Sequence, residues 1–225
     1  MTKGILYLVG TPIGNLEDIT MRGLRILGEV DVIAAEDTRE TLVLLSHYGI
    51  KKRLISYREY NKVKSSKYII DLIDSGKSVA LVCDRGMPGI SDAGVCLVKQ
   101  VVENGIEVIA VPGPTALITS LVVSGFSTGG FVFEGFLPRK KGKLRKVLTE
   151  LGSLGRTAVV YESPHRILKT LEEMLDVWGD CNIVICRELT KKFEEVIRGK
   201  VSAAIKHFSD VKPRGEFTIV VESLK

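Results

Sequence analysis

The chain is 225 residues long, with 45% hydrophobic and 26% charged residues and a net charge of +5. This length allows one large or two small domains with a buried core, and the composition is that of an ordinary soluble globular protein. The longest apolar stretch is interrupted by prolines and a glycine at 112–114, so we expect no membrane span, which needs about 18 apolar residues in a row.

The first half alternates strand-like apolar runs with helix-like segments. Expected strands are 5–9, 30–35, 53–57, 78–83 and 107–111, and expected helices are 20–29, 39–48, 62–74 and 93–104. Thr20 is a candidate N-cap of the first helix. Such alternation is typical of a parallel sheet with helices on both faces.

The second half changes in style. It has expected helices at 115–124, 143–151, 165–177 and 201–208, and expected strands at 131–136, 157–161, 182–186 and 216–221, with 194–198 as a candidate fifth strand. Several connections are too short for crossover helices, which favours a mixed sheet. We therefore predict two α/β domains, 1–112 and 113–225, meeting at Pro112-Gly113-Pro114.

Charge is distributed unevenly between these halves. Residues 1–112 hold 14 basic and 14 acidic side chains, whereas residues 113–225 hold 18 and 13. Six of the cations lie within residues 139–146. A basic cluster favours a polyanion such as nucleic acid, although a solvated helix start would look the same.

Three expected strands of the first half end in loops rich in glycine and proline, at residues 10–15, 84–91 and 112–115. In open parallel sheets, ligands bind outside the carboxyl ends of the strands. Glycine lets a backbone approach closely and proline fixes the shape of a loop. The pattern predicts a small molecule held mainly by main-chain groups.

Cysteines and histidines form no recognisable metal or disulfide pattern. The four cysteines include no C-x-x-C pair, and the three histidines are scattered. The N-terminal residues lack the order of a signal peptide. We expect a reduced, cytoplasmic protein without a structural metal site.

Residues 9–20, Val-Gly-Thr-Pro-Ile-Gly-Asn-Leu-Glu-Asp-Ile-Thr, differ from the G-x-G-x-x-G of dinucleotide folds and resemble the opening loop of the tetrapyrrole methylase superfamily. Further matches follow in the same order at 34–39, 112–114, 161–166, 187–191 and 215–222. Within the superfamily, the chain is similar to bacterial enzymes that methylate the 2′-oxygen of a cytidine in small-subunit (16S) ribosomal RNA. The resemblance implies two α/β domains with S-adenosylmethionine in the cleft between them, a homodimer, and no metal in the methyl transfer.

The second loop departs from the family pattern, which usually reads Ser-Asp-Ala-Gly-Thr-Pro. Here residues 83–88 read Cys-Asp-Arg-Gly-Met-Pro, so Arg85 and Met87 are unusual. The sequence also ends at Lys225, before the helical extension that many members carry. These departures leave a non-catalytic RNA-binding homologue as one alternative. A methylase of a tetrapyrrole or of diphthine is another, which residues 35–39, 163–166 and the basic segment disfavour.

The resemblance also implies where the cofactor is held. S-adenosylmethionine carries a sulfonium, an ammonium and a carboxylate, so it needs both acceptors and donors. Asp84 and Ser91 are the side chains expected near its methionyl or ribose end, although Asp84 could instead cap its loop and Thr115 could cap a helix. The expected cofactor-binding residues are Thr11, Pro12, Gly14, Asp84, Gly86, Pro88, Ser91, Pro112, Gly113, Thr115 and Ala116.

Methyl transfer to a hydroxyl is an in-line displacement in which alignment does much of the work and a positioned base can take the proton. The candidates for this base follow expected strands and are Glu36, Asp37, Glu162, Glu188 and Lys191. Each has a structural alternative, because Glu36 and Asp37 could pair with Arg39, and Glu188 with Lys191. Asn15 could orient the substrate hydroxyl or only stabilise its own turn, and no base is assigned.

Arginine side chains can bind phosphate through two parallel hydrogen bonds, in a bidentate geometry. Arg39, Arg166 and Arg187 are expected to contact RNA directly, and Arg139, Lys140, Lys141 and Lys143 to attract it over longer range. Because a ribose must reach a cleft, we expect single-stranded or distorted RNA.

Overall fold

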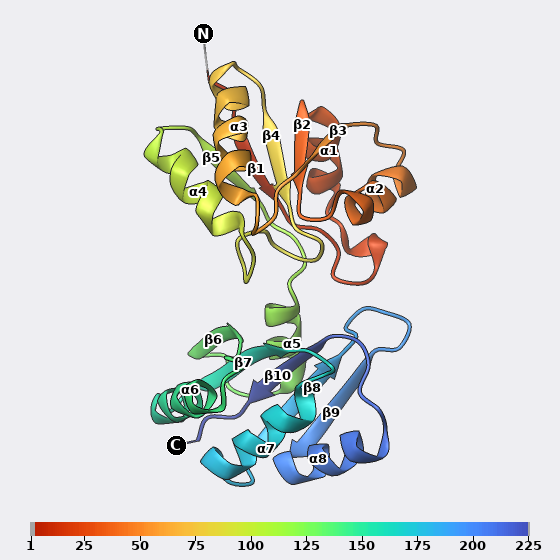
Figure 1. Ribbon diagram of the computed structural model, residues 1–225. Helices are drawn as coiled ribbons and strands as arrows, with labels where there is room; N and C mark the ends of the chain where they lie inside the picture. The colour runs from red at the N-terminus through yellow and green to blue at the C-terminus, as the bar shows by residue number, and fades with distance from the viewer. Residues whose placement is uncertain (1–2, 225) are drawn as a thin grey trace. The chain divides into compact units, whose positions relative to one another are not determined.

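The computed structural model describes residues 3–224 (Figure 1). Two compact units, Met1–Thr115 and Ala116–Lys225, make up the chain. The domain boundary between residues 112 and 113 stays a prediction. None of the helices among the described residues has the length and apolar character needed to cross a membrane.

The first unit contains a five-stranded sheet in the order β3-β2-β4-β1-β5. Every pairing in it is parallel. The strands are β1 (Leu6–Val9), β2 (Val32–Ala35), β3 (Arg53–Ser56), β4 (Val79–Val82) and β5 (Val108–Val111). β2 and β4 are buried along their whole length, as expected for central strands covered on both faces.

Helices cover both faces of this sheet, as the alternation predicted. The core on one face holds residues of α1 (Met21–Glu29) and α2 (Thr38–His47), and the core on the other holds residues of α3 (Lys62–Asp74) and α4 (Gly94–Glu103). β1 leads to α1 and its neighbour β4 leads to α4, so these adjacent strands send the chain to opposite faces. Such a topological switch point is where open α/β sheets bind ligands.

Local sequence signals predicted the positions of the helices in this unit well. Thr20 caps α1, because its Oγ1 accepts the N–H of Gly23 at 3.0 Å, and α3 has the predicted bounds. The short 3₁₀ helix η1 (Leu16–Asp18) was not predicted; it begins at Asn15, whose side chain accepts the N–H of Glu17 at 3.1 Å.

The second unit contains a mixed sheet in the order β6-β7-β10-β8-β9. β6 and β7 pair in parallel, and the remaining pairs are antiparallel. The strands are β6 (Phe131–Phe136), β7 (Thr157–Glu162), β8 (Asn182–Arg187), β9 (Glu195–Lys200) and β10 (Phe217–Val221). The mixed sheet is confirmed, and β9 confirms the candidate fifth strand.

One face of this sheet is covered by α6 (Lys141–Ser153), α7 (Ile167–Trp178) and α8 (Val201–Asp210), which share one apolar core with it (Figure 1). α5 (Ala116–Ser124) packs against β10 and β7. Val160 and Ile219 belong to the helix-covered core, and their buried neighbours Val159 and Val220 point to the opposite face by strand alternation.

Candidate active site

Three loops touch at the carboxyl edge of the first sheet. They follow β1 (residues 10–15), β4 (residues 84–93) and β5 (residues 112–115). Thr11 and Gly86 form an isolated antiparallel bridge, in which each N–H donates to the other's carbonyl at 2.9 and 3.1 Å. The first two predicted loops are therefore joined by main chain at the switch point between β1 and β4.

The side chain of Thr11 strengthens this junction. It is 3% exposed, and its Oγ1 donates to the carbonyl oxygens of Cys83 at 3.1 Å and Gly86 at 3.3 Å. The Sγ of Cys83 also lies 3.3 Å from the Gly86 carbonyl oxygen. The hydroxyl proton of Thr11, a predicted cofactor contact, is thus used by the protein itself.

Glycines allow the first and third loops to touch. A Cβ added to Gly10 would lie 2.7 Å from the Cα of Gly113 and 2.7 Å from the Sδ of Met87. Gly86 has a φ of 87°, which other residues rarely adopt. The close contact at Gly10 and the positive φ at Gly86 explain why these loops contain glycine.

Two carboxylates from neighbouring strand ends face each other here. Asp84 accepts the N–H of Asp37 at 2.7 Å, and Glu36 accepts the N–H of Asp84 at 3.4 Å. Burial is the main cause that raises the pKa of both Glu36 and Asp84, and the nearby charge of Asp84 raises that of Glu36 further. Asp84 therefore does cap a loop, as its structural alternative stated.

Asp37 has the opposite electrostatic character. Its carboxylate accepts from the Nε and Nη2 of Arg39 at 3.0 and 2.6 Å and from the main-chain N–H of Arg39, and it also pairs with Arg58 at 2.8 Å. Hydrogen bonds from Arg39 are the main cause that holds the pKa of Asp37 well below its usual range. Asp37 is therefore an N-cap of α2 whose ionised form the arginines favour. Arg58, which sequence reasoning missed, also donates from its Nε to the Glu36 carbonyl at 2.6 Å.

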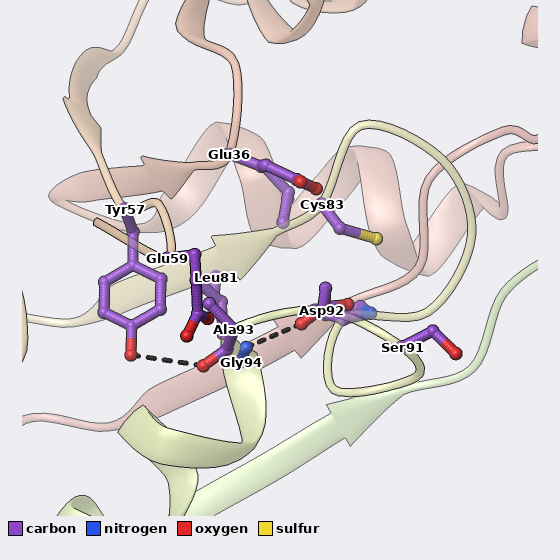
Figure 2. A pocket seen from close by; sticks show the side chains of 11 residues that line it. Glu36, Tyr57, Glu59, Leu81, Cys83, Ser91, Asp92, Ala93 and Gly94 are labelled. Carbon is purple, nitrogen blue, oxygen red and sulfur yellow. Dashed lines mark hydrogen bonds between the residues drawn. The ribbon is translucent and has the colours of Figure 1, made fainter. Parts of the chain in front are cut away.

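A cavity of about 300 Å³ opens beside this cluster (Figure 2). Its size is at the lower end for ligand pockets. Glu36, Glu59 and Asp92 give it an acidic lining, so it favours a ligand with positive charge or hydrogen-bond donors. The other residues that line it are Tyr57, Leu81, Val82, Cys83, Pro88, Ser91, Ala93 and Gly94.

Hydrogen bonds fix the walls of this cavity. Asp92 accepts the N–H of Gly89 at 2.9 Å and that of Gly94 at 2.6 Å, and the Tyr57 hydroxyl donates to the Ala93 carbonyl at 3.3 Å (Figure 2). Ser91 has a φ of 65°, an unusual conformation for a residue with a side chain. Pro88 and Ser91 were predicted from the family pattern, whereas Tyr57 carried no motif that could have revealed it.

The unusual residues of the second loop leave the cavity free. Arg85 is exposed and Met87 contacts Gly10, and neither lines the cavity. Of the other predicted cofactor residues, Pro12 is buried, Gly14 and Pro112 are exposed, and Thr115 and Ala116 are half-buried. Asn15 is exposed and uses its side chain oxygen to cap η1.

In the second unit, Glu162 is a buried structural group. Its side chain is 0% exposed, and it accepts from the Oγ1 of Thr170 at 2.6 Å and from the N–H of Ser163 at 2.8 Å. It also pairs with Arg166 at 3.4 Å, whose guanidinium donates to the Leu137 and Pro138 carbonyls. These contacts leave Glu162 poorly suited to take a proton from a substrate, and Arg166 poorly suited to bind phosphate.

The expected pair between Glu188 and Lys191 is present. The Nζ of Lys191 lies 2.7 Å from Glu188 and 2.9 Å from Glu216. Arg187 pairs with Glu195 at 3.0 Å and donates from its Nε to the carbonyl of Arg214. These side chains hold the strand ends of the second sheet together.

Part of the basic segment has ion pairs within its own unit. Lys141 lies 2.8 Å from Glu173, and Arg145 pairs with the same carboxylate at 2.6 Å. Arg139, Lys140 and Lys143 are exposed, and none of them forms an ion pair within residues 3–224. Three cations are therefore free at the start of α6.

A family model described as Tetrapyrrole (Corrin/Porphyrin) Methylases matches residues 5–205. The chain belongs to the tetrapyrrole methylase family. Among curated members, "Ribosomal RNA small subunit methyltransferase I" of Thermotoga maritima is 53% identical, with 97% of this chain and 98% of the relative aligned. The protein of the same name from Halalkalibacterium halodurans is 49% identical over 98% of this chain and 76% of its own length.

Solved structures of a diphthine synthase and of a cobalt precorrin-4 methyltransferase share the fold. A diphthine synthase superimposes with a TM-score of 0.75 at 16% identity, covering 97% of this chain and 90% of its own. A cobalt precorrin-4 methyltransferase superimposes with a TM-score of 0.73 at 18% identity, covering 98% and 96%. The predicted fold class and the prediction of a methyltransferase from this family are confirmed.

Proposed function

We propose that this protein transfers the methyl group of S-adenosylmethionine to the 2′-oxygen of a cytidine ribose in 16S ribosomal RNA, acting in the cytoplasm as a homodimer. The observation that carries the proposal is the identity of about half of all residues, over nearly the whole chain, with proteins named ribosomal RNA small subunit methyltransferase I. The substrate is the RNA itself or the small ribosomal subunit.

The joined loops of the first unit support a sulfonium cofactor. Glu36, Asp84 and Asp92 supply negative charge close to the loops, and main-chain groups approach closely where Gly10 meets Gly113. A cationic, hydrogen-bonding molecule fits this donor and acceptor set better than an anion does. When bound, S-adenosylmethionine supplies an electrophilic methyl group on a good leaving group.

Glu36 is the best-placed candidate base of this unit. It lines the cavity and its pKa is raised by burial, whereas Asp37 is held ionised by two arginines. A carboxylate with a raised pKa takes a proton more readily at neutral pH, and Glu36 would accept the proton that the 2′-hydroxyl must lose when its oxygen is methylated.

The free cations support an RNA substrate. Arg139, Lys140 and Lys143 have no partners among the described residues that would neutralise them. Phosphate contacts of this kind supply affinity without sequence preference. Arg39 is exposed as well, but the interaction with Asp37 occupies its guanidinium.

The experiment that tests the proposal is the mapping of the methyl group. Unmethylated 16S RNA, from a strain lacking the modification, is incubated with the protein and labelled S-adenosylmethionine, and the labelled nucleoside is identified by mass spectrometry. We expect a single 2′-O-methylcytidine. Transfer to a porphyrinoid but not to RNA would contradict the proposal, as would an absence of cofactor binding in calorimetry.

A further inference from the structure

The loop between β8 and β9 carries an exposed aromatic ring. Phe193 is 67% exposed, although four residues earlier Leu189 is buried. The connection leaves the edge of the second sheet, as Figure 1 shows. An exposed apolar side chain is common by itself, so its meaning depends on how the loop around it is built.

Hydrogen bonds hold this loop in a strained backbone conformation. Glu188 and Thr190 have φ values of 51° and 65°, which residues with side chains rarely adopt. The N–H of Glu188 donates to the Glu216 carbonyl at 3.0 Å, and the N–H of Glu216 donates to the Glu188 carboxylate at 3.0 Å. Glu194 accepts the N–H of Thr190. Strain of this kind persists only where surrounding contacts enforce it, and it gathers at functional sites.

One cation lies close to the exposed ring. The Nζ of Lys192 lies 5.6 Å from the ring centroid of Phe193, and both side chains face solvent. Arg214 is also exposed. Its main-chain carbonyl accepts a hydrogen bond from the Nε of Arg187, the residue before the loop, at 2.7 Å. The nearby acids are already engaged, because Glu194 bonds to the loop backbone and Glu216 pairs with Lys191.

An exposed aromatic ring with a neighbouring cation, on a loop held by hydrogen bonds, matches the way proteins bind single-stranded RNA. Unpaired bases stack on Phe, Tyr or Trp rings, and Lys or Arg side chains contact the adjoining phosphates. We propose that Phe193 stacks on an unpaired base of the RNA substrate while Lys192 contacts the neighbouring phosphate. The inference rests on the proposed function, because it requires an RNA substrate.

The test compares Phe193→Ala and Phe193→Trp with the unaltered protein in binding to unmethylated 16S RNA. We expect Phe193→Ala to weaken binding roughly 5- to 100-fold, the range for the loss of one stacked base, without a change in salt dependence. Phe193→Trp retains a stacking surface and should bind normally, with tryptophan fluorescence quenched by RNA. Lys192→Gln should reduce the slope of log affinity against log salt by about one.

Controls separate this inference from the proposed function. Val211→Ala removes another exposed apolar side chain of the same unit and should leave RNA affinity unchanged, and all variants should bind S-adenosylmethionine normally. If the unaltered protein methylates RNA but Phe193→Ala binds RNA with equal affinity, the inference fails and the function stands. A Phe193→Ala protein that only changes its oligomeric state would likewise overturn it. If the unaltered protein neither binds nor methylates RNA, both are wrong.

Discussion

The hydroxyl of Thr11 links the loop after β1 to the loop after β4. Its removal therefore tests directly whether the junction of these loops depends on this hydrogen bond. Thr11→Val keeps the shape of the side chain and removes the donor shared by the carbonyl oxygens of Cys83 and Gly86. The main-chain bridge between Thr11 and Gly86 remains possible in the variant. Thr11→Ser is the matched control, because it keeps the hydroxyl and loses only a methyl group.

The expected cost follows from the burial of these groups. An acceptor left without its donor in the interior costs about 1–3 kcal/mol. The Gly86 carbonyl keeps the N–H of Thr11, so the loss falls on the carbonyl of Cys83, which is buried like Thr11. The free energy of unfolding of Thr11→Val should fall by about that amount. If the loops hold the cofactor, its Kd should rise roughly fivefold or more, because about 1 kcal/mol of lost loop order corresponds to that factor.

Urea denaturation followed by circular dichroism measures the first quantity, and calorimetric titration of S-adenosylmethionine measures the second. Thr11→Ser should lie close to the unaltered protein in both. The reasoning would be refuted if Thr11→Val matched Thr11→Ser to within about 0.5 kcal/mol, the usual range for surface substitutions. A loss of stability with unchanged cofactor affinity would refute only the link between the junction and the cofactor.

Three further predictions concern other parts of the structure. Gly113→Ala places a Cβ 2.7 Å from the Cα of Gly10, so unfolding free energy should drop by about 1–3 kcal/mol and cofactor binding should weaken; unchanged calorimetry would contradict this. Burial raises the pKa of Glu36 in the folded state. The contribution of the Glu36 carboxyl to stability is therefore present below its pKa in the unfolded state and is lost as pH rises through its pKa in the folded state. Glu36→Gln should therefore gain stability relative to the unaltered protein between pH 4 and pH 7 in urea titrations, and a constant difference across that range would count against the buried carboxylate. The double variant Lys140→Gln/Lys143→Gln should flatten the salt dependence of RNA binding by about two, whereas Lys146→Gln, a cation that lies 3.8 Å from Glu150, should change it less; equal slopes in filter binding would show that the free lysines are only a solvated surface.

Local sequence patterns predicted most of the fold. The alternation of apolar runs with helix-like segments indicated the parallel sheet, and Thr20 marked a helix start that the structure confirms. Shared motifs indicated the family, which the comparisons confirm. These features depend on residues close together in the chain, or on a pattern that a whole family repeats.

Such patterns did not predict contacts between residues that are far apart in the sequence. β2 lies between β3 and β4 in the sheet, and this order brings Asp84 beside Glu36 and lets Arg58 reach Asp37. Nothing near Glu162 in the sequence distinguishes it from an exposed acid, yet Thr170 and Arg166 enclose it. Residue type therefore indicated several candidates for the catalytic base. It did not distinguish a side chain that contacts a bound molecule from one that only stabilises the fold.

The two apolar cores that enclose the first sheet have a consequence for how such proteins diversify. Strands buried on both sides hold the sheet together through these two cores, so exposed positions of the connecting loops can change with less risk to the scaffold than buried ones such as Thr11. Proteins named for work on diphthine and on cobalt precorrin share the arrangement at 16% and 18% identity. The scaffold therefore leaves the exposed positions of its turns free to vary.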